Sequence, residues 1–142
     1  KTKKDVTIIT NSAFIADYIR KNGHVDIILL GGQYQQESQV MVGPITKRCM
    51  EPFFVDKLFI GIDGFNEKTG FTGNDFMRGE TVKDMTKQAN KVIVVSDSGK
   101  FGRLGLVNLV PTSQVSCVIT DDKINESSKL YLEEQGIEVI AV

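Results

Sequence analysis

The chain has 142 residues, of which 41% are hydrophobic and 25% charged, and this size and composition indicate one globular domain with a core of its own. Its 17 basic and 18 acidic residues leave a net charge of −1, without the basic excess that a domain needs to grip DNA phosphates. A single histidine, and two cysteines without metal-ligand spacing, exclude a histidine-based catalytic triad and a multi-histidine metal site.

Strand-like and helix-like stretches alternate along the chain. Short apolar runs rich in β-branched residues predict strands at residues 6–9, 25–30, 57–62, 91–96, 115–120 and 137–142. Apolar side chains at helical spacing, bounded by capping residues, predict helices at residues 13–22, 44–53, 77–90 and 126–135. The polar stretch 33–39 is typical of an exposed loop or irregular edge, and the glycine-rich stretch 65–75 of a loop.

This alternation favours one architecture. Strands that alternate with helices predict an α/β fold with a mostly parallel, Rossmann-like sheet and helices on both faces. The chain shows no internal repeat, low-complexity tract or linker, so we expect residues 1–142 to form a single domain. No apolar run is long enough to cross a bilayer, and none follows the basic first residues as in a signal peptide, so we expect a cytoplasmic protein.

Polar and small residues collect where the predicted strands end. Ligands of a parallel sheet bind at the carboxyl ends of its strands, where the following loops meet. The residues at those ends are Thr10, Asn11, Ser12, Gly31, Gly32, Asp63, Gly64, Asp97, Ser98, Gly99, Lys100, Thr120, Asp121 and Asp122. Glycines allow close approach, hydroxyls and helix-start N–H groups suit phosphate, carboxylates accept sugar hydroxyls, and Lys100 adds a positive charge. The set predicts a pocket for a small, anionic, polyhydroxylated molecule.

Each candidate also has a purely structural explanation. Ser12 can serve only as a helix cap, and the glycine pair after the second strand only as a turn. The aspartate–glycine step after the third strand is a common turn sequence. Glu80 and Lys83, three residues apart on a predicted helix, are typical of surface ion pairs. The functional interpretation depends on these residues meeting at one edge of the sheet.

A series of short motifs resembles the signature of DeoR-family sensor domains. The motifs occupy residues 9–12, 29–32, 42–44, 56–64, 70–72 and 96–102, and residues 119–122 close the series. Each motif alone is weak, whereas their order along nearly the whole chain is specific. The resemblance implies a fold similar to ribose-5-phosphate isomerase, glucosamine-6-phosphate deaminase and the coenzyme A transferases.

The resemblance also implies a function. DeoR-family proteins are bacterial regulators, many of them repressors, of carbohydrate catabolism; a winged helix-turn-helix binds the operator, and the sensor domain binds a phosphorylated pathway intermediate. We therefore expect a sensor for a phosphorylated sugar or polyol that self-associates, needs no cofactor, and reaches DNA only through a domain before Lys1. The residues expected to bind the effector are Asn11, Ser12, Gly31, Gly32, Asp63, Gly64, Thr72, Glu80, Lys83, Asp97, Ser98 and Lys100.

The related enzymes provide a comparison for catalysis. Residues 61–67 resemble the deaminase signature, but Phe65 stands where its catalytic histidine would be. Residues 78–83 are similar to the isomerase segment with the acid–base glutamate, which corresponds to Glu80, but residues 69–75 replace the isomerase's glycine run. These departures favour a sensor. An isomerase-like enzyme and an oligomerisation domain with a vestigial pocket are the alternatives.

The family pattern departs from this chain at its start. DeoR-family sensors carry a phosphate-binding Gly-Thr-Thr loop well before the motif at residues 9–12, and that loop would precede Lys1. We therefore interpret the chain as a fragment of a sensor domain. We expect it to bind its effector weakly by itself and to catalyse nothing.

Overall fold

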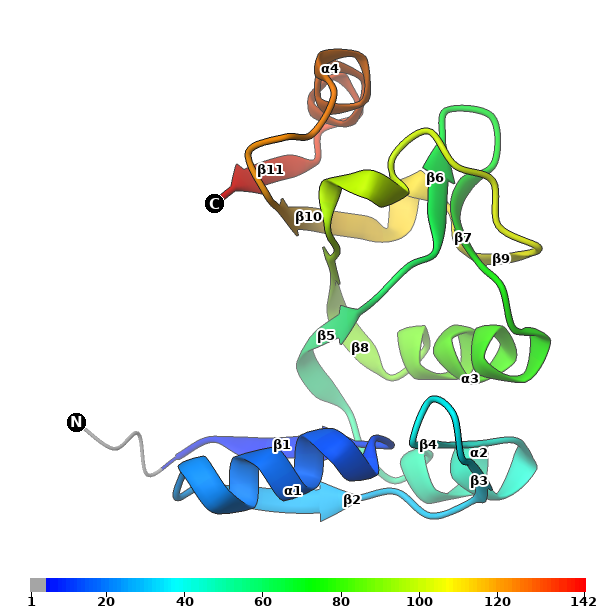
Figure 1. The fold of residues 1–142 in the computed structure, drawn as a ribbon. Helices are drawn as coiled ribbons and strands as arrows, with labels where there is room; N and C mark the ends of the chain where they lie inside the picture. Colours follow the sequence, from blue (N-terminus) through cyan, green and yellow to red (C-terminus); the bar gives the residue numbers. More distant parts are fainter. Residues whose placement is uncertain (1–4) are drawn as a thin grey trace. The chain divides into compact units, whose positions relative to one another are not determined.

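The computed structural model of the chain describes residues 5–142 (Figure 1). The chain divides into two compact units, the first ending at Pro52 and the second comprising Phe53–Val142. The single sensing domain expected over residues 1–142 stays a prediction. No helix among residues 5–142 is long and apolar enough to span a membrane.

The first unit begins with a strand–helix–strand segment. β1 (Thr7–Thr10) and β2 (Asp26–Leu29) pair in parallel, so the chain has to cross between them, and α1 (Ala13–Asn22) makes that crossing. The Ser12 hydroxyl accepts a hydrogen bond of 3.1 Å from the backbone N–H of Ile15, which caps the start of the helix as predicted.

An antiparallel hairpin and a short helix complete the first unit. β3 (Gln33–Gln35) pairs with β4 (Val40–Val42), and α2 (Pro44–Met50) follows. The exposed loop or irregular edge predicted over residues 33–39 begins with a regular strand, β3, whose side chains do not alternate between apolar and polar as a half-buried strand would. α2 ends earlier than predicted, because Pro52 has no backbone N–H with which to continue the hydrogen bonds of the helix, although Glu51 before it still has helical backbone angles.

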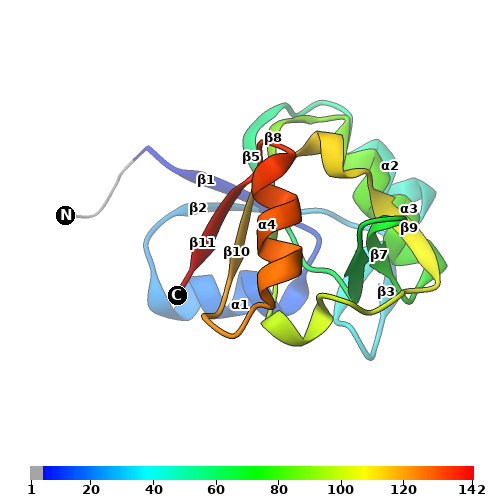
Figure 2. The same ribbon diagram turned by 90° about the horizontal axis from the view of Figure 1, so that it is seen from above.

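A four-stranded parallel sheet forms the centre of the second unit. In the spatial order β11–β10–β8–β5, its strands are β11 (Glu138–Ala141), β10 (Val115–Thr120), β8 (Ala89–Val95) and β5 (Val55–Ile60). α3 (Phe76–Thr86) precedes β8, and α4 (Glu126–Glu134) connects β10 to β11. Figures 1 and 2 show α4 lying along β10 and β11. The predicted α/β fold with a parallel sheet flanked by helices is confirmed.

A smaller antiparallel sheet accompanies the parallel one. β6 (Gly64–Asn66) and β7 (Gly70–Gly73) form a hairpin, and β9 (Val107–Val110) pairs with β7. The prediction of a loop over residues 65–75 is wrong, because such short, glycine-rich strands hold too few apolar positions to show a period. β9 was not predicted either.

Two phenylalanines of the hairpin enter the core of the second unit. Phe65 and Phe71 are each 0% exposed, and their ring centroids lie 4.8 Å apart. They belong to the same buried cluster as Val94, Val118 and Leu132, which are also 0% exposed. Burying a side chain of this size stabilises a fold by about 1.5–3 kcal/mol. The hairpin is therefore anchored in the core, and the loops at its ends have defined positions.

Candidate ligand-binding site

Three loops meet at one edge of the parallel sheet. β5, β8 and β10 are neighbours and run in the same direction, so their carboxyl ends lie together. The backbone N–H of Ser98, after β8, donates to Asp121 Oδ2, after β10, at 2.7 Å. Within the second unit, the prediction that the strand-end loops share an edge is confirmed.

A pocket of about 280 Å³ opens beside the loop after β5. The residues that line it are Gly61, Ile62, Asp63, Gly73, Asn74, Asp75, Arg78, Gly79, Val82 and Leu109. The backbone N–H of Asn74 donates to Asp63 Oδ2 at 2.8 Å and ties the end of β7 to the loop after β5. Asp75 Oδ1 accepts from the backbone N–H of Arg78 at 2.8 Å and so caps α3. Asp63 is the predicted site residue that this pocket contains.

Arg78 is the lining residue that the sequence pattern missed. Its side chain is 43% exposed, and its Nε lies 3.8 Å from Asp75 Oδ1, beyond hydrogen-bonding distance. In the structure, Arg78 follows the capping residue Asp75 by three positions and lies on the same side of the helix start, which the sequence alone did not show.

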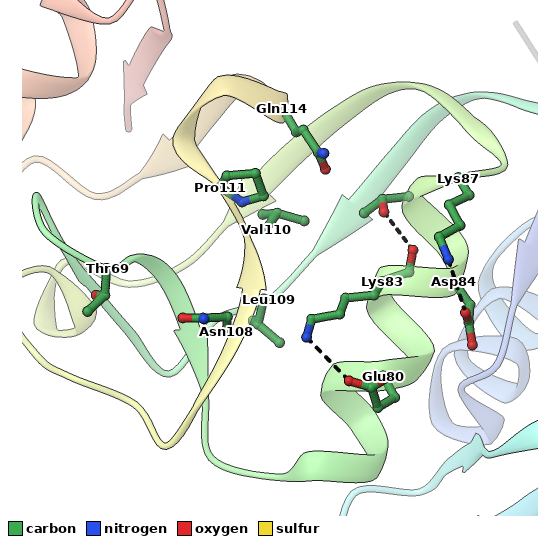
Figure 3. Close-up of a pocket in the computed structure, with 11 residues that line it drawn as sticks. Thr69, Glu80, Lys83, Asp84, Lys87, Asn108, Leu109, Val110, Pro111 and Gln114 are labelled. Atoms are coloured by element: carbon green, nitrogen blue, oxygen red, sulfur yellow. Dashed lines mark hydrogen bonds and ion pairs between the residues drawn. The ribbon is translucent and has the colours of Figure 1, made fainter.

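Glu80 and Lys83 line a different hollow, of about 500 Å³ (Figure 3). It lies between α3 and the segment of β9 and the following 3₁₀ helix, η2 (Thr112–Gln114). Lys83 Nζ lies 3.3 Å from Glu80 Oε1, and the two side chains are 43% and 48% exposed. The structure therefore does not bring this pair to the pocket of Asp63. Its geometry is that of an ordinary surface ion pair on a helix.

The predicted residues after β8 form a short 3₁₀ helix, η1 (Ser98–Lys100). Asp97 Oδ1 accepts from the backbone N–H of Gly99 at 2.9 Å. Lys100 is half-buried and lines neither of the two hollows. Hydrogen bonds from Ser98, and then one from the backbone N–H of Lys123, lower the pKa of Asp121 below its ordinary value, so the loop is held by a carboxylate.

Gly64 and Thr72 lie in the interior of the second unit. Thr72 is 1% exposed, and its Oγ1 accepts from the backbone N–H of Gly105 at 2.8 Å. A Cβ on Gly64 would lie 2.7 Å from the carbonyl oxygen of Arg103, so only glycine fits there. Both residues hold residues 101–106 against the hairpin of β6 and β7.

The remaining predicted residues lie in the first unit, where each has a local structural role. Asn11 Nδ2 donates to the carbonyl of Met41 at 2.8 Å, and Ser12 caps α1. Gly32 has φ +145°, and the carbonyl of Gly31 accepts a hydrogen bond of 2.7 Å from Thr46 Oγ1. These contacts account for the local structure of the first unit. Among residues 5–142, no three potential metal ligands gather as a metal site would require.

Comparison with known proteins identifies the family. Residues 1–122 match the sequence profile described as the DeoR C terminal sensor domain. The chain belongs to this family. The recognition made from the short motifs is therefore confirmed.

The sensor domain is similar to several helix-turn-helix transcriptional regulators. It is 29% identical to the transcriptional repressor GlcR of Bacillus subtilis over 136 residues, and this alignment covers 96% of the chain and 52% of GlcR. It is 28% identical over 142 residues to the transcriptional regulator GlpR of Haloferax volcanii, covering 99% of the chain and 55% of GlpR. It is 25% identical to the transcriptional regulator IolR of B. subtilis over 134 residues, and this alignment covers 94% of the chain and 53% of IolR. The sensor domain spans about half the length of the curated relatives it matches.

Proposed function

We propose that this chain is the effector-sensing part of a DeoR-type transcription regulator of carbohydrate catabolism, and that it binds a phosphorylated sugar or polyol beside Asp63. The observation that carries the proposal is the pocket at the carboxyl end of β5, inside a domain of the DeoR sensor family. Carboxylates such as Asp63 accept hydrogen bonds from sugar hydroxyls, and ligands of parallel sheets bind at this edge.

The loop after β8 supplies the next part of the proposed site. Lys100 lies on η1, at the same sheet edge as Asp63 but outside its pocket, and is proposed to reach the anionic group of the effector from that side. Asp97 and Ser98 would orient the loop and contact hydroxyls. Asn11, Ser12, Gly31 and Gly32 of the first unit stay predicted effector contacts.

Effector binding would act on DNA through residues outside this chain. The relatives are named helix-turn-helix regulators and are about twice as long as the chain. We infer that a DNA-binding domain accompanies the sensor and that effector binding changes its affinity for the operator. Regulators that read two-fold symmetric operators are commonly dimers or larger, so the sensor is also proposed to self-associate.

A purely regulatory role is favoured over an isomerase-like enzyme. Phe65, at the position of the deaminase histidine, is 0% exposed and packs against Phe71, Phe101 and Tyr131. Glu80, at the position of the isomerase glutamate, is paired with Lys83 in the other hollow. Neither residue is placed to move a proton on a ligand held beside Asp63.

A thermal-shift screen tests the proposal. The chain is heated with ribose 5-phosphate, glucose 6-phosphate, fructose 1-phosphate or glycerol 3-phosphate, each at up to 10 mM, and with the unphosphorylated parent compounds. A ligand at 100 times its dissociation constant stabilises by about 2.7 kcal/mol, which is several degrees in the unfolding midpoint. A phosphorylated compound should raise the midpoint without being turned over. Turnover of any of them would establish an enzyme instead.

A further inference from the structure

Among the described residues that line the pocket beside Asp63, Arg78 is the cation; it pairs loosely with Asp75, but one of its hydrogen-bond donors has no acceptor. Arg78 Nε is buried and has no hydrogen-bond acceptor among residues 5–142. The nearest carboxylate oxygen, Asp75 Oδ1, lies 3.8 Å away and already accepts from the backbone N–H of Arg78 at 2.8 Å. A buried N–H of a charged group is costly without an acceptor, so this donor favours an oxygen brought by a ligand.

The other charged groups of the pocket are engaged in holding its walls. Asp63 Oδ2 accepts from the backbone N–H of Asn74, and Asp75 caps α3. Lys100 does not line this pocket, and Lys83 lines the hollow on another face of α3. Among the described lining residues, Arg78 is therefore the group with the charge and the donor that an oxyanion needs. The amino-terminal end of α3, at Asn74 and Asp75, adds a favourable partial positive charge.

We propose that Arg78 binds the oxyanion of the effector, a phosphate monoester or a carboxylate, through its buried Nε–H and one exposed guanidinium N–H. This inference rests on the proposed function, since it names the residue that selects the charged end of a ligand held beside Asp63. The fork of the guanidinium matches two oxygens of a phosphate or carboxylate, which a lysine cannot match. Asp63 is left to accept hydroxyl groups of the same molecule.

Nuclear magnetic resonance of the arginine Nε–Hε groups observes this contact directly. The labelled 142-residue chain is titrated with glucose 6-phosphate, gluconate, inorganic phosphate and glucose, while the backbone amide of Asn74 reports on occupancy of the pocket. Arg20, bonded to Asp17, and Arg103, which does not line the pocket, are internal references. The Arg78 Nε–H signal should move downfield with the phosphates or with gluconate and stay in place with glucose.

A matched pair of variants gives the affinity. Arg78→Gln keeps a polar, though shorter, side chain but removes the guanidinium and its charge, and Arg103→Gln makes the same change outside the pocket. Losing one charge-assisted contact should weaken binding of the anionic ligand about tenfold or more in Arg78→Gln alone. Affinity for glucose should change less than threefold, whereas a merely structural role of Arg78 would lower both affinities together.

The outcomes separate this inference from the function on which it rests. A shift of the Asn74 amide without a shift of Arg78 Nε–H, or equal affinity in Arg78→Gln, overturns the role of Arg78 and leaves the sugar-phosphate pocket standing. No shift of Asn74 with any anionic ligand at 10 mM overturns both. A shift with gluconate but not with either phosphate assigns the oxyanion to a carboxylate and contradicts the phosphorylated effector.

Discussion

Replacing Thr72 by valine should lower the stability of the chain and leave its affinity for a sugar phosphate unchanged. The side chain is 1% exposed, and its Oγ1 accepts from the backbone N–H of Gly105 at 2.8 Å. Valine has nearly the same shape but no acceptor, and an unpaired buried N–H costs about 1–3 kcal/mol. Gly105 is half-buried, so we expect the lower part of that range, about 1–2 kcal/mol, or roughly 3–8 °C in the unfolding midpoint for a chain of this size.

Urea unfolding followed by circular dichroism measures this loss, and calorimetric titration with glucose 6-phosphate measures the affinity. Thr69→Val is the matched control, because the Thr69 hydroxyl also bonds within the hairpin, to Asn66 Oδ1 at 2.9 Å, but from a more exposed position. Its effect on stability should be smaller. If Thr72→Val keeps the stability of the parent chain and loses ligand affinity, the hydroxyl contacts the effector and the structural role assigned to it is refuted.

Three other results are expected. Lys100→Ala should weaken effector binding about tenfold to a hundredfold, as the loss of one charge-assisted contact does, with little effect on stability; unchanged affinity in a calorimetric titration would remove Lys100 from the site. Asp121→Asn should destabilise the chain at neutral pH. The pKa of Asp121 is lower in the folded than in the unfolded state, where it is about 3.9, so its carboxylate contributes to folding stability above that pH. This contribution is lost as the pH falls through the folded-state pKa, and the stabilities of parent and variant should therefore converge below about pH 4. A constant difference in stability down to about pH 2 would argue against the carboxylate. The chain should also self-associate at high micromolar concentration, and a strict monomer in sedimentation would count against an interface in this domain.

The two central parallel strands, β8 and β10, were predictable because most of their residues are apolar, and the middle of each strand is buried. β8 and β10 show runs of β-branched residues that no helix or loop would need. The end of α3 was not predictable in the same way, since Val82, Met85 and Ala89 continue a helical spacing. In the structure, Ala89 pairs with Val55 of β5, and this pairing starts β8. Strand pairing of this kind is a tertiary contact, which local secondary-structure preferences do not reveal.

The site was predictable in its location and only partly in its residues. Asp63 follows a strand of the parallel sheet, and that position alone places it at the ligand-binding edge. Arg78 and Glu80 lie two positions apart on α3, and spacing along the chain does not show which of them faces the loop after β5. That choice depends on the face of α3 packed against β9, where a Cβ on Gly79 would lie 3.0 Å from Val107. The helix therefore turns Arg78 to the pocket and Glu80 away from it.

The most direct measurement is a calorimetric titration of glucose 6-phosphate, ribose 5-phosphate, fructose 1-phosphate and glycerol 3-phosphate into the parent chain and into Asp63→Asn. The variant keeps an oxygen acceptor for the Asn74 backbone N–H and so keeps the wall of the pocket, but it loses the charge and one acceptor for sugar hydroxyls. We expect saturable binding of at least one phosphorylated compound to the parent chain, and affinity at least about tenfold lower in the variant with an unchanged unfolding midpoint. Equal affinity in the two proteins, or no binding to the parent chain at 10 mM, would contradict a sugar-phosphate site beside Asp63.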